Sequence, residues 1–428
     1  MHSARNRYLK AAGALRGHVD DGPAEGHCGV ALMPFLSVVF VVLLGALSVY
    51  GAEMKFHDRS AWRLENEQLR VTVLEGGGHV AEIVLKDSGG GESINPLWVP
   101  KWPSIEPWEF SFEEHGDTYG RSSESALLAS IMGHNLCFDF WGGPSQTEFV
   151  AGLAFHGDAS LVRSAKISQD AESLTHHFDL KRSGTALTRT LRMVRGQPVL
   201  YVEEKVENKL VIDRPLGWVQ HVTFGSPFVD PDASFFDASA TKGHVTKGEE
   251  EVAAQWPVGS SESREQDHRR FAPEAPSGKM SYFLLDPARE VEFVSGVNTK
   301  HRLLLAYVFQ RQDFPWVMVW EENRRIQDPP WSGKEMTRGM EFGNTRIPGT
   351  MQAYFKRPRI HDTPTFGWLT AKEKRTVRYL AVMSSIPEGF TGVRNIRLEG
   401  SEIVVEGIGV KTPLRINYRP ELFVPSQP

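Results

Sequence analysis

The stretch LRVTVLEGGGHVAEIVLKD (residues 69 to 87) alternates apolar and polar side chains on both sides of a glycine-rich break. A period of two is typical of half-buried β-strands, so this stretch predicts two strands joined by a turn. Short strands of this kind, repeated along the chain, indicate a mainly antiparallel all-β protein, either a sandwich or a barrel. Similar runs recur at LTRTLRMV (187 to 194), VLYVEEKVEN (199 to 208), MSYFLL (280 to 285), LLLAYVF (303 to 309), WVMVWEE (316 to 322), TVRYLAVMSS (376 to 385), NIRLEG (395 to 400) and EIVVEGIG (402 to 409).

Other parts of the chain lack this alternation. The clearest helical pattern is short and covers residues 122 to 132. Residues 246 to 278 are rich in Glu, Ser, Arg and Pro, which predicts a long loop or insertion. NPLWVPKWPSIEPWEF (95 to 110) contains three tryptophans among four prolines and is too rigid and aromatic for a linker. We expect one β domain over residues 53 to 390, followed by terminal strands and a tail over residues 391 to 428.

Composition narrows the class of protein. The 428 residues carry a formal net charge of −5 with a pI near 6.3, and both charge signs are interspersed. The sequence has no basic stripe that would neutralise several phosphates, so nucleic acid is not an expected partner. An apolar fraction of 40% with 24% charged residues is typical of a globular protein with an ample core.

The N-terminal region predicts export. Residues 30 to 52 carry no formal charge, include FLSVVFVVLLGALSVYGA and follow several basic residues. We expect residues 1 to 52 to be a signal peptide cleaved near Gly51 or Ala52 or, alternatively, a retained membrane anchor. The folded part would then be periplasmic or extracellular, and only this segment would contact a membrane. A start at Met33 would leave no basic residue before the apolar run.

Three glycine-bounded segments carry ionisable residues that suggest chemistry. GLAFHGDAS (152 to 160) and GWVQHVTFG (217 to 225) each contain one histidine, and TRGMEFGNT (337 to 345) contains one glutamate. Each segment has the pattern of a strand, in which alternate side chains share a face. A histidine and a carboxylate brought together in a sheet would form an acid/base pair.

The strand pattern predicts the surroundings of these side chains. His221 lies opposite a largely apolar set of neighbours, which suggests that it faces a concave surface or solvent. Glu341 has a glycine on each side along its own face, and these glycines would leave space for a ligand ring. His156 shares its face with Asp158, which makes Asp158 a further candidate for ligand contact.

The order of these segments resembles the aldose 1-epimerase, or galactose mutarotase-like, family. FHGD (155 to 158) is similar to the family's histidine–glycine pair, HVTFG (221 to 225) to its strand histidine followed by an aromatic residue, and MEFGN (340 to 344) to its strand glutamate. The resemblance spans roughly residues 60 to 390. It implies a β-supersandwich that binds a small sugar in an open cleft and interconverts its anomers without a metal or an organic cofactor.

The resemblance also implies roles for three residues. Glu341 would be the general base that takes the proton from the anomeric hydroxyl, and His221 would be the general acid that protonates the ring oxygen. Rotation in the open sugar, followed by closure with the roles reversed, gives the other anomer. His156 would hold the sugar and its ring oxygen in place.

Further sugar contacts are less well defined by the sequence. The family's Asn-Arg-Ile run is absent, and GHNLCFDF (133 to 140) occupies roughly its place, with His134 and Asn135 as candidate substitutes. Arg338 would contact a hydroxyl, lower the pKa of Glu341, or simply lie on the surface. Trp320, which has two tryptophans nearby in the sequence, would offer an aromatic face to a pyranose or else fill the core.

Other functions remain open on the sequence alone. A glycoside hydrolase needs two carboxyl groups, which Asp158 and Glu341 would supply, although a histidine occupies the central segment. A non-catalytic carbohydrate-binding protein would keep the cleft without turnover. A metal site is not expected, because His156, Asp158, His221 and Glu341 lack the close spacing of metal ligands. The sequence predicts no oligomeric state.

Overall fold

The computed structural model describes residues 54–86, 93–247, 250–258, 267–346 and 348–424. These residues belong to one compact unit that spans residues 51–428. The signal peptide or anchor expected over residues 1–52 lies outside the described residues. None of the helices in the described ranges has the length and apolar character needed to cross a membrane.

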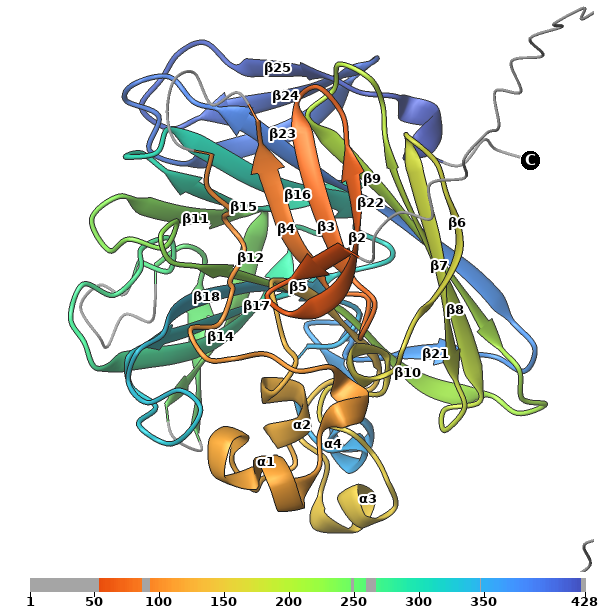
Figure 1. Cartoon of the computed structure of the whole chain (residues 1–428). Coiled ribbons are helices and arrows are strands. Elements are labelled where there is room, and N and C mark those ends of the chain that lie inside the picture. The colour runs from red at the N-terminus through yellow and green to blue at the C-terminus, as the bar shows by residue number, and fades with distance from the viewer. Residues whose placement is uncertain (1–53, 87–92, 248–249, 259–266, 347, 425–428) are drawn as a thin grey trace, which may run out of the picture. The chain divides into compact units, whose positions relative to one another are not determined.

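Two large antiparallel sheets dominate the described residues (Figure 1). The first sheet has twelve strands within these ranges. In spatial order they are β1 (Met54–Phe56), β2 (Arg59–Glu65), β3 (Leu69–Leu74), β4 (Val80–Leu85), β5 (His134–Asp139), β10 (Arg214–Gly225), β18 (Met336–Gly343), β17 (Trp316–Asn323), β14 (Ser277–Leu285), β12 (Ala240–Lys247) and β13 (Glu250–Gln255), and β21 (Gly367–Leu369) pairs with β10.

The second sheet has eight strands within the described ranges. In spatial order they are β11 (Ser234–Ala238), β15 (Val291–Asn298), β16 (Leu303–Gln310), β22 (Lys374–Ser385), β9 (Val199–Asn208), β8 (Thr185–Met193), β7 (Ser173–Leu180) and β6 (Ala165–Gln169). Most of the hydrophobic core lies between the two sheets, because its largest cluster contains apolar side chains from both of them.

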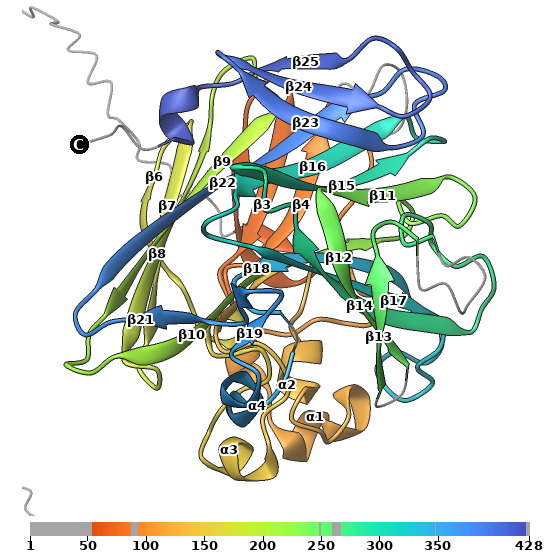
Figure 2. The same ribbon diagram turned by 180° about the vertical axis from the view of Figure 1, so that it is seen from behind.

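Smaller elements cover opposite ends of the strands, as Figures 1 and 2 show from two sides. A three-stranded sheet lies at one end, and the α-helices gather at the other. The sheet consists of β23 (Val393–Glu399), β24 (Glu402–Gly407) and β25 (Leu414–Asn417), and a separate pair consists of β19 (Arg359–Ile360) and β20 (Thr363–Pro364). The helices are α1 (Phe112–Tyr119), α2 (Ser125–Leu128), α3 (Gln146–Val150) and α4 (Met351–Lys356), with 3-10 turns η1 (Pro107–Glu109), η2 (Ala159–Leu161) and η3 (Pro420–Leu422).

The predicted strands agree well with the structure, and the predicted helix and loop agree less well. The stretch 69 to 87 forms β3 and β4, as its alternation predicts. The helical pattern over residues 122 to 132 forms only the short α2. The loop predicted over residues 246 to 278 is interrupted by β13, which pairs with β12 as a hairpin. A capping box between Ser145 and Glu148, a readable helix-start signal, begins α3.

A buried polar network fixes the orientation of β10, the strand that carries His221. Arg189 pairs with Glu204 at 2.7 Å, and neither side chain is exposed. Glu204 accepts hydrogen bonds from the Trp218 indole and from the Gln220 amide, each at 2.8 Å. Since alternate residues of a strand point in opposite directions, these contacts inside the core leave His221 on the outer face of the sheet.

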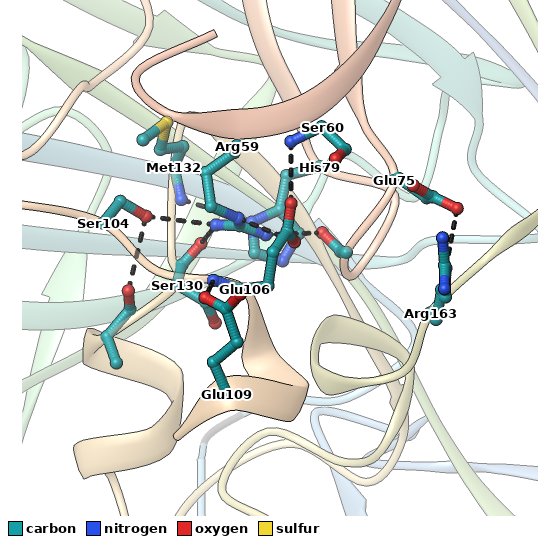
Figure 3. Close-up of polar contacts among 12 residues, drawn as sticks. Arg59, Ser60, Glu75, His79, Ser104, Glu106, Glu109, Ser130, Met132 and Arg163 are labelled. Carbon is teal, nitrogen blue, oxygen red and sulfur yellow. Dashed lines mark hydrogen bonds and ion pairs between the residues drawn. The ribbon is translucent and has the colours of Figure 1, made fainter. Parts of the chain in front are cut away.

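A buried ion pair fastens the long segment between β4 and β5 to the first sheet (Figure 3). Arg59, at the start of β2, donates from Nε to Glu106 Oε2 at 2.9 Å, and the Arg59 side chain is completely buried. The same guanidinium donates to the carbonyl oxygens of Ser130 and Gly76 at 2.7 and 3.1 Å. One side chain therefore holds this segment at residue 106 and again at residue 130.

Glu106→Gln should destabilise the protein by about 3–5 kcal/mol, because it leaves the Arg59 charge buried without a counter-ion. Urea unfolding followed by tryptophan fluorescence measures this loss. Glu67→Gln is the matched control, since its ion pair with Arg195 is largely exposed and we expect almost no change. Similar losses in the two variants would contradict a structural role for the buried pair.

Candidate active site

Neighbouring strands β10 and β18 bring His221 and Glu341 together. The strands pair antiparallel with Val219 opposite Gly343, and this register sets residues 221 and 341 opposite each other. His221 Nε2 lies 3.3 Å from Glu341 Oε1. On the other side of the ring, His221 Nδ1 lies 3.2 Å from Thr223 Oγ1. The sheet thus positions an imidazole against a carboxyl group, as the sequence pattern suggested.

Burial controls the protonation of this pair. It lowers the pKa of His221 to about 4 and raises the pKa of Glu341 well above its ordinary value. The Trp141 indole lowers the pKa of Glu341, but this effect is smaller than the increase caused by burial. Because the two groups are in contact, they titrate as a coupled pair, and burial favours the state in which Glu341 carries the proton and His221 is neutral.

Gly339 makes room for the Glu341 carboxyl group. A Cβ atom at residue 339 would lie 2.6 Å from Glu341 Oε1. At residue 343, a Cβ atom would lie 2.6 Å from Val219 Cγ2. The expectation that both glycines leave space for a ligand is therefore corrected: one space holds the carboxyl group itself, and the other permits close approach of β10.

His156 reaches the same site from a turn. Its φ of +61° is left-handed, so the strand predicted over residues 152 to 160 is wrong here. The His156 ring lies 5.1 Å from the His221 ring, measured between centroids. Its Nδ1 accepts a hydrogen bond from the Gly142 backbone N–H at 3.0 Å. Burial and the nearby His221 lower the pKa of His156, so the ring is neutral and its Nε2 carries the proton.

Asp158 and Asn135 hold the loop that carries His156 and do not line the pocket beside it. Asp158 forms an ion pair with Arg182, whose Nε donates to Asp158 Oδ2 at 3.1 Å. Asn135 Nδ2 donates to Ser160 Oγ at 3.1 Å. The shared face predicted for His156 and Asp158 fails because residues 155 to 158 form a turn.

Arg338 lies on the opposite face of β18 from Glu341. It is completely buried, where it pairs with Glu321, donates to the His268 carbonyl and lies over the Phe236 ring. The roles considered for Arg338 are therefore corrected: it does not lie on the surface, and it does not line the pocket beside Glu341. Its guanidinium pairs with Glu321 and not with Glu341.

His156, His221 and Glu341 line a cavity of about 260 Å³. This volume is close to the lower end of the roughly 300–1,000 Å³ typical of small-molecule sites. Trp320 also lines the cavity, together with Trp98 and Trp331. The rings of Trp98 and Trp331 are stacked, with their centroids 5.5 Å apart and an angle of 8° between their planes. Trp316, their neighbour in sequence, is buried elsewhere, and its indole donates to the Pro364 carbonyl at 2.7 Å.

Sequence reasoning missed Glu124, which lines the cavity at the start of α2. Its side chain is half-buried, and its apolar surroundings raise its pKa to about 7. Nothing in the sequence around Glu124 distinguishes it, whereas the tryptophan- and proline-rich stretch 95 to 110 was a usable signal for Trp98. Within the described ranges, no three His, Cys, Asp or Glu side chains are grouped to hold a metal ion.

Comparison with known proteins identifies the fold. A scan against models of protein families finds no match, and a search of curated proteins finds none. A galactose mutarotase-like protein from Clostridium acetobutylicum is 14% identical over 78% of this chain and 98% of that chain, with a TM-score of 0.53. A Klebsiella pneumoniae protein proposed to be an aldose 1-epimerase is 13% identical over 74% of this chain and 76% of that chain, with a TM-score of 0.50.

A third match is a TPR-domain containing protein from Parabacteroides distasonis, which is 12% identical over 80% of this chain and 49% of that chain, with a TM-score of 0.51. The expected galactose mutarotase-like, mainly antiparallel β-sandwich is thus confirmed. At these identities the likeness shows the fold alone. The activity of the protein is therefore determined by the residues of the pocket and not by the fold.

Glu341→Gln should change how stability depends on pH. The folded state keeps a proton on Glu341 that the unfolded chain releases above the ordinary pKa of 4.5. The Glu341 contribution to the free energy of unfolding therefore falls as pH rises from that value towards the raised pKa. Below pH 6.5 the lowered pKa of His221 offsets this fall in the wild type, so the effect of Glu341 is read from the difference between wild type and variant. Glutamine has no such proton, so the variant should gain stability over the wild type at neutral and alkaline pH. Urea unfolding at several pH values measures this, and identical slopes would contradict a protonated Glu341.

Proposed function

We propose that this protein is an aldose 1-epimerase-like isomerase that interconverts the anomers of a small sugar. The observation that carries the proposal is the 3.3 Å approach of His221 Nε2 to Glu341 Oε1 in a cavity lined by tryptophans. Aromatic faces suit the apolar side of a pyranose ring. The galactose mutarotase-like fold supports a carbohydrate ligand, since matching structures include one proposed to be an aldose 1-epimerase.

His221 and Glu341 together can accept one proton and donate one proton, which is what opening of the sugar ring requires. The anomeric hydroxyl must lose a proton while the ring oxygen gains one, and the ring C–O bond breaks to leave an open-chain aldehyde. Glu341 as carboxylate takes the first proton, and His221 as imidazolium supplies the second. Rotation about the bond between the first two carbons and the reverse transfers then close the ring as the other anomer.

The protonation state that burial favours differs from this reactive form in the position of one proton. Burial places the proton on Glu341, whereas ring opening with Glu341 as base requires it on His221. The two groups are already in contact, so the transfer needs no rearrangement of the sheet. A sugar hydroxyl that donates to Glu341 stabilises the carboxylate, and a ring oxygen that accepts from His221 stabilises the imidazolium, so substrate binding favours the reactive form.

His156 would position the sugar. Because the Gly142 N–H occupies Nδ1, the Nε2–H of the neutral ring remains as a donor for a sugar oxygen. The turn geometry fixes the direction of this donor, since Gly157 follows at a φ of +80° and a Cβ there would lie 2.3 Å from the Phe138 carbonyl oxygen.

The two alternative functions, a glycoside hydrolase and a non-catalytic carbohydrate-binding protein, need different residues in the pocket. A glycoside hydrolase that uses Asp158 with Glu341 loses support, because Asp158 is paired with Arg182 and does not line the pocket. A carbohydrate-binding protein without turnover would use the same cavity and differs only in rate. Export remains a prediction that rests on the sequence of residues 30 to 52.

His221→Ala and Glu341→Gln should each slow anomer exchange by about 10²–10⁴-fold, the usual contribution of one acid or base. NMR of freshly dissolved α-glucose and α-galactose measures the exchange. His177→Ala is the matched control, because it removes a histidine from β7 in the other sheet and should leave the rate unchanged. Sugar binding by a wild type that never accelerates exchange would favour the binding protein, and oligosaccharide hydrolysis that is lost in Glu341→Gln would favour the hydrolase.

The rate should also depend on pH in a defined direction. Acidification through the His221 pKa of about 4 puts a second proton on the pair and removes the base, so kcat/KM should fall below about pH 4. At alkaline pH the pair loses its last proton and kcat/KM should fall again. Initial rates of anomer exchange at subsaturating sugar give this profile, and a rate that rises steadily on acidification would contradict it.

A further inference from the structure

The cavity beside His221 and Glu341 has apolar walls. One wall comes from α2 and the residues after it, with Leu127, Leu128 and Ile131. The facing wall comes from the loop between β17 and β18, with Ile326 and Trp331. These side chains form one hydrophobic cluster with Trp98, so most of the surface above the acid/base pair offers no hydrogen bond.

The sheet side of the cavity is also apolar around the pair. Met280 of β14 and Met318 of β17 line it together with Trp320, and all three pack in one cluster with Val219. Thioether side chains adapt to irregular apolar ligands and make poor hydrogen-bond acceptors. The ionisable groups are thus surrounded by apolar side chains.

Hydrogen-bonding capacity is concentrated in a few groups. Apart from tryptophan indoles, the polar side chains among the described residues lining the cavity are those of Glu124, His156, His221 and Glu341. The Trp98 indole is already used, because it donates to Glu335. His156 Nδ1 accepts from the Gly142 backbone, and the two ring nitrogens of His221 lie against Thr223 and Glu341.

A free aldohexose carries a hydroxyl on nearly every carbon. The polar groups of this cavity would form hydrogen bonds with the sugar hydroxyls near the anomeric carbon. The remaining hydroxyls would face leucine, isoleucine, methionine and tryptophan side chains. A buried hydroxyl without a partner weakens binding by about tenfold or more, whereas a methyl group in its place gains from burial. The pocket therefore penalises an unmodified hexose.

We infer that the substrate is a reducing sugar in which apolar groups, as in deoxy or O-methyl sugars, replace ring hydroxyls away from the anomeric centre. This inference rests on the proposed function for the need of a free anomeric hydroxyl. The anomeric end lies against His221 and Glu341, and the substituted face lies against Trp331 and Ile326.

Titration calorimetry with glucose, 3-deoxyglucose, 4-deoxyglucose and 3-O-methylglucose tests the inference, because these sugars differ only in ring hydroxyls that are not next to the anomeric carbon. We expect affinity to rise by about tenfold for each hydroxyl removed or capped on the apolar face. Anomer exchange of each sugar is recorded by NMR in the same samples, so that binding and turnover are judged separately.

Ile326→Gln supplies a polar partner on the half-buried loop wall and should reduce the preference for the modified sugars over glucose. The matched control is Ile167→Gln on β6, where the isoleucine is 63% exposed, and it should leave the preference unchanged. Unfolding curves of both variants establish that each is folded before affinities are compared.

The outcomes separate the two proposals. Tighter binding of the modified sugars, with the preference reduced in Ile326→Gln, supports the inferred substrate class. Equal or tighter binding of glucose overturns that class, while accelerated exchange of glucose would still support the isomerase. A preference for modified sugars without any accelerated exchange supports the ligand class and overturns the isomerase. Failure of every sugar to bind overturns both.

Discussion

The buried ion pair between Arg59 and Glu106 is the contact on which the pocket depends. It holds the segment between β4 and β5, which supplies one wall, against a sheet that supplies the floor. His79 lies beside this pair in Figure 3 and extends the same support. Its Nδ1 accepts from the Met132 backbone N–H at 3.3 Å and its Nε2 donates to the Ser160 carbonyl at 3.1 Å. The wall and the loop after His156 are thereby tied to one buried cluster.

The parts of the structure that could be predicted from the sequence are those governed by a period of two. The alternation of apolar and polar residues in β3, β4 and β10 indicates which face of each strand meets the core. Because that face must be buried, it also fixes the pairing register of the strands. The same reasoning placed His221 and Glu341 on their correct faces. That they meet follows from the order β10-β18, two strands more than a hundred residues apart in the chain, which local pattern alone does not supply.

The positions of the other site residues could not be predicted from the sequence, because they depend on turns and on contacts with residues far away in the chain. His156 adopts a left-handed φ that the sequence of a strand does not announce, although the following glycine is a hint. Arg338 is buried only because Glu321 of the neighbouring strand pairs with it. Glu124 faces the cavity because distant contacts, including those of Arg59, hold the segment around it. Long-range packing, not local propensity, decides such positions.

Glu335 joins the two walls of the pocket to each other. Its carboxylate accepts from the Trp98 indole at 2.9 Å and from the Lys101 backbone N–H at 2.8 Å, and Trp98 stacks on Trp331. Walls that arise far apart in the chain therefore behave as one rigid frame and not as two independent flaps. Such a frame selects ligands by a width set before binding. Little ordering entropy is then lost when a ligand arrives, and a ligand that is too wide is excluded by shape.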